Sequence, residues 1–294
     1  MKPRETRVAW AMLAPALLII ALIVGYPLLR TLFLSFTDAR LTALNLSPHG
    51  VGLQNYLGAL ENPTFLASIG RTTYFVLLNI GLELVLGVLV ALLLNQTFRG
   101  RAWVRALLIV PLALPTVVNA IMWRWIYNPE FGALNALLTQ TGLLESYRSW
   151  LGDPSSVMNA IIVADVWKNY PIVALVALAA LQLIPKELYE AANVDGAGLW
   201  TRFWRITWPG ILPALMVVLV LRTIEAVKVF DIVYVMTRGG PADSTRTVSF
   251  DVYQEGISYL RVGSGAAYAF LVVAVTGVLI ALYIGLLRRQ ERAA

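Results

Sequence analysis

Cysteine is absent from the 294 residues, and histidine occurs once, at His49. Without thiols the chain has neither a disulfide framework nor a thiolate nucleophile, and a histidine-based zinc site would need ligands from elsewhere. Charged residues are also scarce, at 14%, whereas about a quarter is usual in soluble domains. These shortages argue against redox, zinc and soluble-enzyme roles.

What the chain has in abundance is apolar residues, at 59%, with a mean hydropathy of +0.71. This composition is typical of an integral membrane protein. The net charge of +6 is a feature shared with nucleic-acid-binding proteins. Here, however, the basic residues gather at the ends of apolar segments, where they act as topology signals. We therefore expect a lipid environment and no nucleic-acid partner.

Long apolar segments predict an all-α, polytopic protein with six transmembrane helices, because about 20 apolar residues are needed to cross a bilayer. The first segment is too long for a signal-peptide core and is interpreted as a retained span, bent at Pro15 and Pro27. The six expected spans are Val8–Leu29, Ile69–Leu94, Ala106–Tyr127, Val157–Leu183, Ile211–Met236 and Val262–Leu287.

Lysine and arginine in the connecting segments set the orientation, because cytoplasmic loops are enriched in them. Twelve lie on one side: Lys2, Arg4, Arg7, Arg99, Arg101, Arg105, Lys186, Arg202, Arg205, Arg288, Arg289 and Arg292. Five lie on the other: Arg40, Arg148, Arg238, Arg246 and Arg261. Both termini are therefore expected in the cytoplasm.

The stretch Pro185–Pro213 is a polar and amphipathic segment on the predicted cytoplasmic side. Pro185 suits the first position of a helix, and Asp195-Gly196 suits the turn that ends it. A second short helix, Leu199–Thr207, is expected to lie flat at the membrane interface, with Pro209 ending it. From physics alone, an ordinary cytoplasmic loop and a docking element for a partner protein explain this stretch equally well.

The order of residues in the stretch carries further information. It contains Glu190-Ala191-Ala192, Asp195-Gly196-Ala197, and then Phe203, Ile206 and Pro209. This pattern resembles the EAA loop of inner-membrane permease subunits of binding-protein-dependent ABC importers. Stretches similar to the maltose-type sugar permeases are Asn95–Arg105, Pro111 and Pro115 with Trp123, Asn128–Gly132, and Phe230–Asp231 through Gly239–Pro241. Trp208 departs from the family, which more often has leucine there; we expect this to affect packing and not coupling.

The resemblance implies a single permease domain over residues 1–294, of type I ABC importer architecture, with residues 185–213 as its coupling loop. It also implies that the chain lies in the plasma (inner) membrane of a bacterial or archaeal cell. Its partners would be a second homologous permease, two ATP-binding subunits, an extracytoplasmic solute-binding protein and a sugar. ATP and Mg²⁺ would be bound by the partner subunit, and the chain itself has no G-x-x-x-x-G-K-[ST] motif. Glu190 would pair with a basic group of the ATPase, and Ala191, Ala192 and Gly196 would allow a close fit.

Polar residues within the apolar spans form the candidate substrate path, since charged groups at this depth are costly and face protein or water. A mixture of carboxylate, amine, amide and aromatic groups suits a sugar. The candidates are Asn79, Glu83, Asn119, Trp123, Asp165, Trp167, Lys168, Asn169, Tyr170, Lys228 and Asp231. Arg222 and Glu225, at three-residue spacing with Lys228 and Asp231, are interpreted first as structural ion pairs.

Other functions remain open at this point. One alternative is an importer of the same kind for a different solute, such as a glycerol phosphate, a polyamine or an amino acid. Intramembrane carboxylates also occur in intramembrane enzymes, but the sequence shows no paired nucleophile and no metal-ligand spacing. A channel is not favoured either, because no filter-like segment is evident. The expected function is import of a carbohydrate, with no catalytic residue in this chain.

Overall fold

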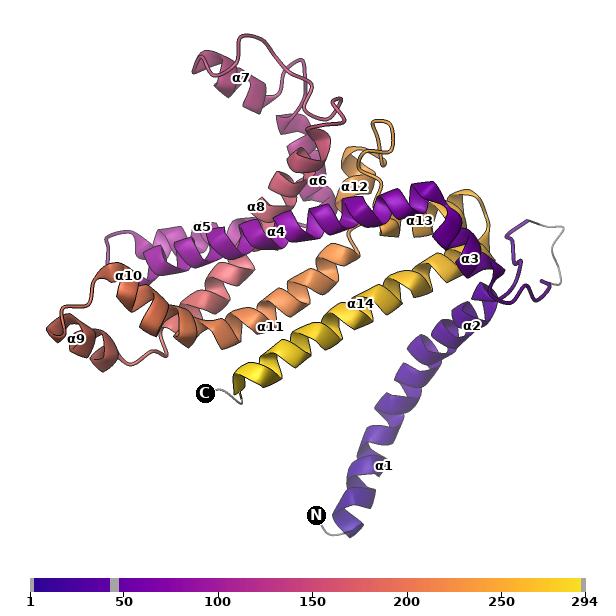
Figure 1. Ribbon diagram of the computed structural model, residues 1–294, viewed down its shortest axis with the longest axis horizontal. Helices are drawn as coiled ribbons and strands as arrows, with labels where there is room; N and C mark the ends of the chain where they lie inside the picture. The colour runs from indigo at the N-terminus through magenta and orange to yellow at the C-terminus, as the bar shows by residue number, and fades with distance from the viewer. Residues whose placement is uncertain (1–2, 43–47, 292–294) are drawn as a thin grey trace. The chain divides into compact units, whose positions relative to one another are not determined.

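The computed structural model describes residues 3–42 and 48–291, and its elements are helices joined by loops and one isolated bridge, Thr37–Gly50 (Figure 1). Lys2 and Arg292, which were counted in the charge tally, lie outside the described residues. The helices up to the middle of the chain are α1 (Pro3–Ile20), η1 (Ala21–Gly25), α2 (Tyr26–Ser35), α3 (Gln54–Glu61), α4 (Pro63–Asn95), α5 (Arg101–Ala113), α6 (Thr116–Ile126) and α7 (Ala133–Gln140). The later ones are α8 (Val157–Leu181), α9 (Lys186–Val194), α10 (Leu199–Arg202), η2 (Phe203–Thr207), α11 (Trp208–Val227), α12 (Asp231–Met236), α13 (Val248–Tyr253), η3 (Gln254–Ser258) and α14 (Val262–Glu291).

Five helices in the described part of the chain are long and apolar enough to cross a membrane, and a sixth span is added if one bent pair counts as a span. The five are Trp10–Ser35, Pro63–Asn95, Val157–Leu181, Leu199–Val227 and Val262–Ala281. The all-α, polytopic prediction is thus confirmed. Three of the expected spans differ in detail.

The expected third span is a broken helix. α5 and α6 meet at an angle of 100°, at the residues Leu114 and Pro115. Leu114 has an extended backbone (φ −76°, ψ 132°) because the proline that follows it disfavours the helical region. Pro115 also has no N–H to continue the helical ladder. The apolar run is continuous in sequence, but the helix is not.

The expected fifth span is wrong at both ends. α11 stops at Val227, and a new helix, α12, begins at Asp231. Between them the Lys228 and Val229 N–H groups donate to the carbonyls three residues back, those of Glu225 (3.1 Å) and Ala226 (3.2 Å). At its start, the helix expected to lie flat runs through the π-helical turn η2 directly into α11, so that Leu199–Val227 forms one 29-residue apolar helix. Pro209 occupies the first turn of α11 and does not end a helix.

The first span also contains a π-helical turn, η1, between α1 and α2. It lies just before Pro27, and the Tyr26 N–H reaches back five residues to the Ala21 carbonyl. A bend was expected at Pro27, and the structure has a π-helical turn, which widens the helix locally, in the residues just before it. Pro15 lies inside α1.

The contacts divide the chain into two compact units, Met1–Leu66 with Asp251–Ala274, and Ala67–Phe250 with Val275–Ala294. In the first unit, the start of α14 packs on residues from the N-terminal part of the chain. The Phe65 and Tyr268 rings lie 4.3 Å apart, and the Gly263 N–H donates to Ala39 (3.0 Å).

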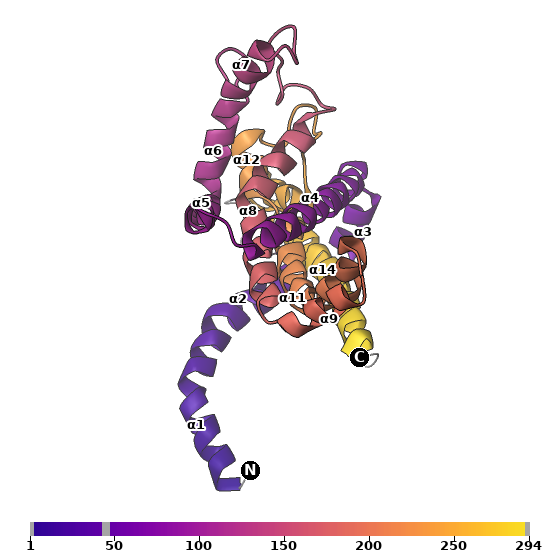
Figure 2. The same ribbon diagram turned by 90° about the vertical axis from the view of Figure 1, so that its left-hand side faces the viewer.

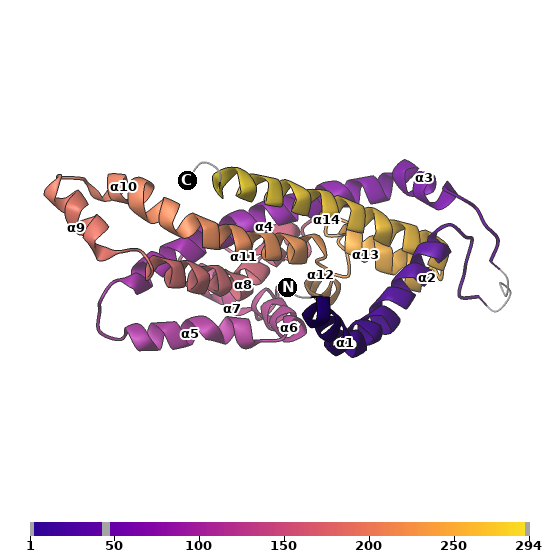
Figure 3. The ribbon, with the colours of Figure 1, turned by 90° about the horizontal axis from the view of Figure 1, so that it is seen from below.

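The second unit is built around α8, which packs along α11 and α5 (Figure 3). Two apolar clusters lie along α8. One surrounds Phe75 and Ile161, and the other surrounds Val173 and Leu215. Helices α9 and α10 project beyond the ends of α8 and α11 (Figure 3), whereas α7 follows α6 at the opposite end (Figure 2). The polar residues considered below are all in this unit.

Helices α4 and α8 lie close together at Gly87. A Cβ atom on Gly87 would lie 2.7 Å from Val173 Cβ, a branched position that does not move without the backbone. We predict that Gly87→Leu destabilises the protein by about 1–3 kcal/mol through overpacking. Gly81→Leu is the matched control on the same helix, because a Cβ there meets nothing within 4 Å. Thermal unfolding of the purified variants checks this, and equal melting temperatures would contradict it.

Candidate functional site

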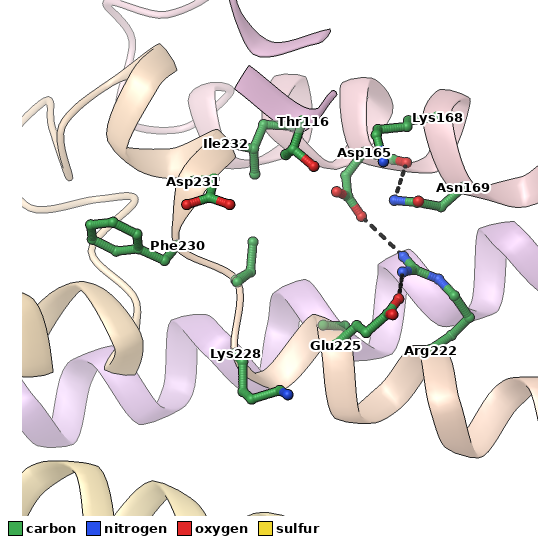
Figure 4. A pocket seen from close by; sticks show the side chains of 12 residues that line it. Thr116, Asp165, Lys168, Asn169, Arg222, Glu225, Lys228, Phe230, Asp231 and Ile232 are labelled. Atoms are coloured by element: carbon green, nitrogen blue, oxygen red, sulfur yellow. Dashed lines mark hydrogen bonds and ion pairs between the residues drawn. The ribbon is translucent and has the colours of Figure 1, made fainter. Parts of the chain in front are cut away.

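A polar cavity of about 310 Å³ lies between α8, α11 and the start of α12 (Figure 4). Asp165 and Asp231 lie on opposite sides of it, with Lys168 and Asn169 on one wall and Arg222 on another. The full lining is Thr116, Asp165, Lys168, Asn169, Arg222, Glu225, Ala226, Lys228, Val229, Phe230, Asp231 and Ile232.

The break between α11 and α12 supplies one wall of this cavity. Phe230 leaves the helical region (φ −139°, ψ −57°), and its carbonyl accepts the Tyr234 N–H (2.8 Å) at the start of α12. Thr247 donates its hydroxyl to the Val229 carbonyl (3.0 Å), which satisfies a backbone group freed by the break. Asp231 lies in the first turn of α12, where a carboxylate is favoured by the helix dipole.

An ion cluster forms the floor of the site. Arg222 on α11 donates to both oxygens of Glu83 on α4 (2.7 and 2.9 Å) and reaches Asp165 on α8 (3.4 Å). It also pairs with Glu225 on its own helix. Asn79 donates to Asp165 (2.7 Å). A two-pronged guanidinium–carboxylate pair is among the stronger polar contacts, and it compensates for the burial of Arg222 and Glu83, which are 6% and 0% exposed.

The cavity brings together five of the eleven candidate path residues: Asp165, Lys168, Asn169, Lys228 and Asp231. Asn79 and Glu83 lie behind it, in the ion cluster. Asn119 donates to the Ala164 carbonyl (3.1 Å) and is fully buried. Trp123 packs edge-on against Trp167 at 5.9 Å, and Tyr170 packs against both apolar clusters. These last four lie outside the lining.

Arg222 and Glu225 line the cavity in addition to forming an ion pair, and the sequence did not indicate their place in its lining. Their ion pair is present as expected. The prediction that the charge ladder continues along one helix is wrong beyond Glu225, because α11 ends at Val227, before Lys228, and Asp231 begins α12. Thr116 and Phe230 were not considered. The proline before Thr116 and the break before Asp231 are what bring them to the cavity.

The coupling-loop candidates lie on α9 and the turn after it. Gly196 has a left-handed backbone (φ +71°), and the Ala197 and Gly196 N–H groups donate to Ala192 (2.8 Å) and Asn193 (3.1 Å). This is a Schellman turn, which needs glycine for its φ angle. Nothing within 4 Å faces a Cβ at Gly196, so the chain's own backbone already explains this glycine.

Helix α9 is held to η2 and to α10 by one polar contact each. The Tyr189 hydroxyl lies 2.9 Å from the Thr207 hydroxyl, and Arg202 donates to Asn193. The rest of the helix is open: Glu190, Ala191 and Asp195 are exposed, and Ala192 is half-buried. Among the described residues, no hydrogen bond or ion pair engages the Glu190 carboxylate. Val194 is 89% exposed. This surface is available to another protein.

The loop that contains α7 is ordered by its own polar contacts. Asn135 accepts the Trp150 indole N–H (2.8 Å), and Arg148 pairs with Asp153 (2.8 Å) while lying 5.2 Å from the Trp150 ring. Hydrogen bonds from the Ser155 backbone and hydroxyl, aided by Arg148, lower the pKa of Asp153 to about 2. The carboxylate therefore stays ionised over any physiological pH.

Comparison with known proteins identifies the family of this chain. A model of the family described as binding-protein-dependent transport system inner membrane component matches residues 83–293. The chain belongs to this family. Its members are transport subunits and not enzymes, and their transport depends on a solute-binding protein. With its several apolar helices, this permease is a multi-pass membrane protein.

Two relatives match almost end to end. The trehalose/maltose transport system permease protein of Thermococcus litoralis is 38% identical over 99% of this chain and 97% of its own. The sulfoquinovosyl glycerol transport system permease protein of Agrobacterium fabrum is 35% identical over 98% and 96%. Among solved structures, a bacterial ABC transporter that imports alginate superposes with a TM-score of 0.83 over 97% and 96% of the two chains, at 23% identity. The permease therefore has the ABC importer permease fold.

The ion cluster yields a stability prediction. Replacing Arg222 by Met leaves the carboxylates of Glu83 and Asp165 buried without their partner, and we expect a loss of about 3–5 kcal/mol. Adding Glu83→Gln removes one of the two stranded charges and should recover part of that loss. Glu225→Gln, at an exposed carboxylate of the same cluster, should change stability by less than about 1 kcal/mol. Thermal unfolding in detergent measures all three. Equal losses in Arg222→Met and Glu225→Gln would refute this account of the cluster.

Proposed function

We propose that this permease is one of two membrane subunits of an ATP-driven carbohydrate importer and forms half of its translocation path. The observation that supports this most is the cavity, where carboxylates, amines, an amide and a hydroxyl line the same space as an aromatic ring. Sugar hydroxyls need paired donors and acceptors, and the C–H face of a sugar ring packs on aromatic surfaces. The relatives that carry sugars in their names support the same class.

The charges of the cavity favour a neutral sugar over a phosphorylated or sulfonated one. Three carboxylates, Asp165, Glu225 and Asp231, face three cations, Lys168, Arg222 and Lys228. Arg222 is also engaged by Glu83, which lies outside the lining. No surplus positive charge is left for an anion. Import of a glycerol phosphate, the solute named for a relative of 31% identity, is therefore the less favoured alternative.

The remaining parts of the proposal concern assembly and topology. Residues 1–294 would act as one permease domain, and residues 185–213 would be its coupling loop on the cytoplasmic side, together with both termini. A second permease, two ATP-binding subunits and an extracytoplasmic binding protein would complete the transporter, with ATP and Mg²⁺ held by the ATP-binding subunits. The segments 38–65, 128–156 and 237–261 are the surfaces proposed to receive the binding protein.

Two cavity residues give the sharpest test of the substrate path. The side chains of Lys168 and Asp231 have no hydrogen bond or ion pair among the described residues, unlike that of Asp165, which belongs to the ion cluster. We expect Lys168→Gln and Asp231→Asn each to lower sugar uptake about tenfold, the loss that one hydrogen bond to a charged group produces. Uptake of labelled neutral oligosaccharide and of labelled glycerol phosphate into proteoliposomes with the full transporter measures both path and solute.

Thr73→Val, at an exposed position of α4 outside the cavity, is the control and should leave uptake unchanged. The variants should retain their ATPase subunits on purification. Unchanged uptake in Lys168→Gln and Asp231→Asn would remove the cavity from the path. Faster uptake of glycerol phosphate than of neutral oligosaccharides would remove the sugar assignment.

Glu190 is proposed as the contact through which the ATPase drives the permease. The carboxylate is exposed on α9 and lacks a partner within the described chain, and a basic group of the ATPase would supply one. Loss of a charged partner at an interface costs about 2–5 kcal/mol, so Glu190→Ala should lower solute-stimulated ATP hydrolysis at least tenfold. Ala191, Ala192, Asp195, Gly196 and Ala197 complete the proposed contact.

Glu187→Ala is the matched control, because Glu187 is exposed in the first turn of the same helix. It should keep near-normal stimulation, and both variants should insert into the membrane at wild-type levels. Substitution of Gly196 is a poorer test, since any side chain strains the turn regardless of the ATPase. Normal stimulation and uptake in Glu190→Ala would exclude Glu190 as the coupling contact.

A further inference from the structure

An apolar groove of about 620 Å³ lies where α8 ends and α9 and η2 begin. Its size is within the range of about 300–1,000 Å³ that is typical of ligand pockets. One lining residue is charged, Arg205, and the others are apolar. The lining is Ala180, Leu183, Ile184, Pro185, Leu188, Arg205, Ile206, Pro209, Gly210, Pro213 and Ala214.

The length of the α10–η2–α11 helix places this groove at the edge of the bilayer. The 29 residues of Leu199–Val227 extend roughly 43 Å at 1.5 Å per residue, whereas the hydrocarbon core is about 30 Å thick. At least one end of the helix therefore reaches into the headgroup layer, and we assign the first turns to it because of their aromatic residues. A cluster of four aromatic rings marks the same level, as interfacial aromatic residues do: Trp200, Phe203, Trp204 and Trp208.

Arg205, the charged residue of the lining, is an unengaged cation. Its side chain is exposed, and no hydrogen bond or ion pair engages it within the described part of the chain. The neighbouring Arg202 differs, because it donates to Asn193. A guanidinium group matches the oxygens of a phosphate. The same groove also presents exposed apolar side chains, since Leu183 is 83% exposed and Leu188 is 49% exposed.

We propose that the groove is a binding site for an anionic phospholipid, with an acyl chain along the apolar lining and the headgroup phosphate on Arg205. The apolar lining suits hydrocarbon, and a single cation at its rim suits one headgroup. A soluble ATPase subunit would instead need polar partners for its own surface, which the groove offers only at Arg205. The lipid would occupy the space between α8 and α11 at the base of α9.

Native mass spectrometry of the assembled transporter, with phosphatidylglycerol and phosphatidylethanolamine of identical chains added in turn, tests this site. The wild-type permease should retain phosphatidylglycerol preferentially. Arg205→Gln should reduce that preference about fivefold, the effect of one basic residue near an anionic surface. Leu183→Gln should weaken retention of both lipids, because it places an amide on the apolar wall.

Arg99→Gln is the matched control. It removes the same charge from another exposed arginine on the same predicted side of the membrane, and Arg99 lies outside the groove. Equal retention of the two lipids by the wild-type protein, or equal losses in Arg205→Gln and Arg99→Gln, would overturn the proposal. So would dissociation of the ATPase subunits in Arg205→Gln with lipid retention unchanged, since the groove would then be an ATPase contact.

Discussion

The Arg222 cluster is the interaction on which the second unit depends, because one guanidinium joins three helices at membrane depth. It lies on α11, takes both oxygens of Glu83 on α4, and reaches Asp165 on α8. Apolar packing gives little preference for one helix arrangement over another in lipid, where the tails are as apolar as the side chains. The polar contacts of Arg222, which water cannot replace in the membrane, therefore fix the arrangement of the three helices. The cavity lies beside this cluster and is lined by Arg222 and Asp165.

The same cluster shows what the sequence could predict and what it could not. Hydropathy locates α4, α8 and α14, since each is a single long apolar helix. The expected ends lie within a few residues of the observed ones, except at the start of α4. It cannot locate the breaks at Leu114–Pro115 and Lys228–Phe230, because a profile averaged over about 20 residues stays apolar across both. Lys228 and Asp231 were visible as charges, but only the break turns them to the same cavity as Lys168.

The coupling loop divides in the same way. The end of α9 follows local rules, and Asp195-Gly196 marks it correctly because only glycine takes the left-handed conformation there at little cost. The close-fit role expected for Gly196 was not needed to explain it. Glu190 is the opposite case. Within the described chain its carboxylate is exposed and makes no hydrogen bond or ion pair. Its proposed role therefore comes from the family pattern and not from the fold.

The helix Leu199–Val227 connects these parts, and its construction bears on the mechanism proposed here. Its first turns hold α9 through Thr207 and Arg202, and its last two turns carry Arg222. A continuous helix passes displacement along its length, so a movement of α9 would reach the ion cluster. Because Arg222 is bound at both prongs to Glu83, α4 and α11 would move together. The non-helical residues between α11 and α12 are then where the movement is absorbed, and these residues line the cavity.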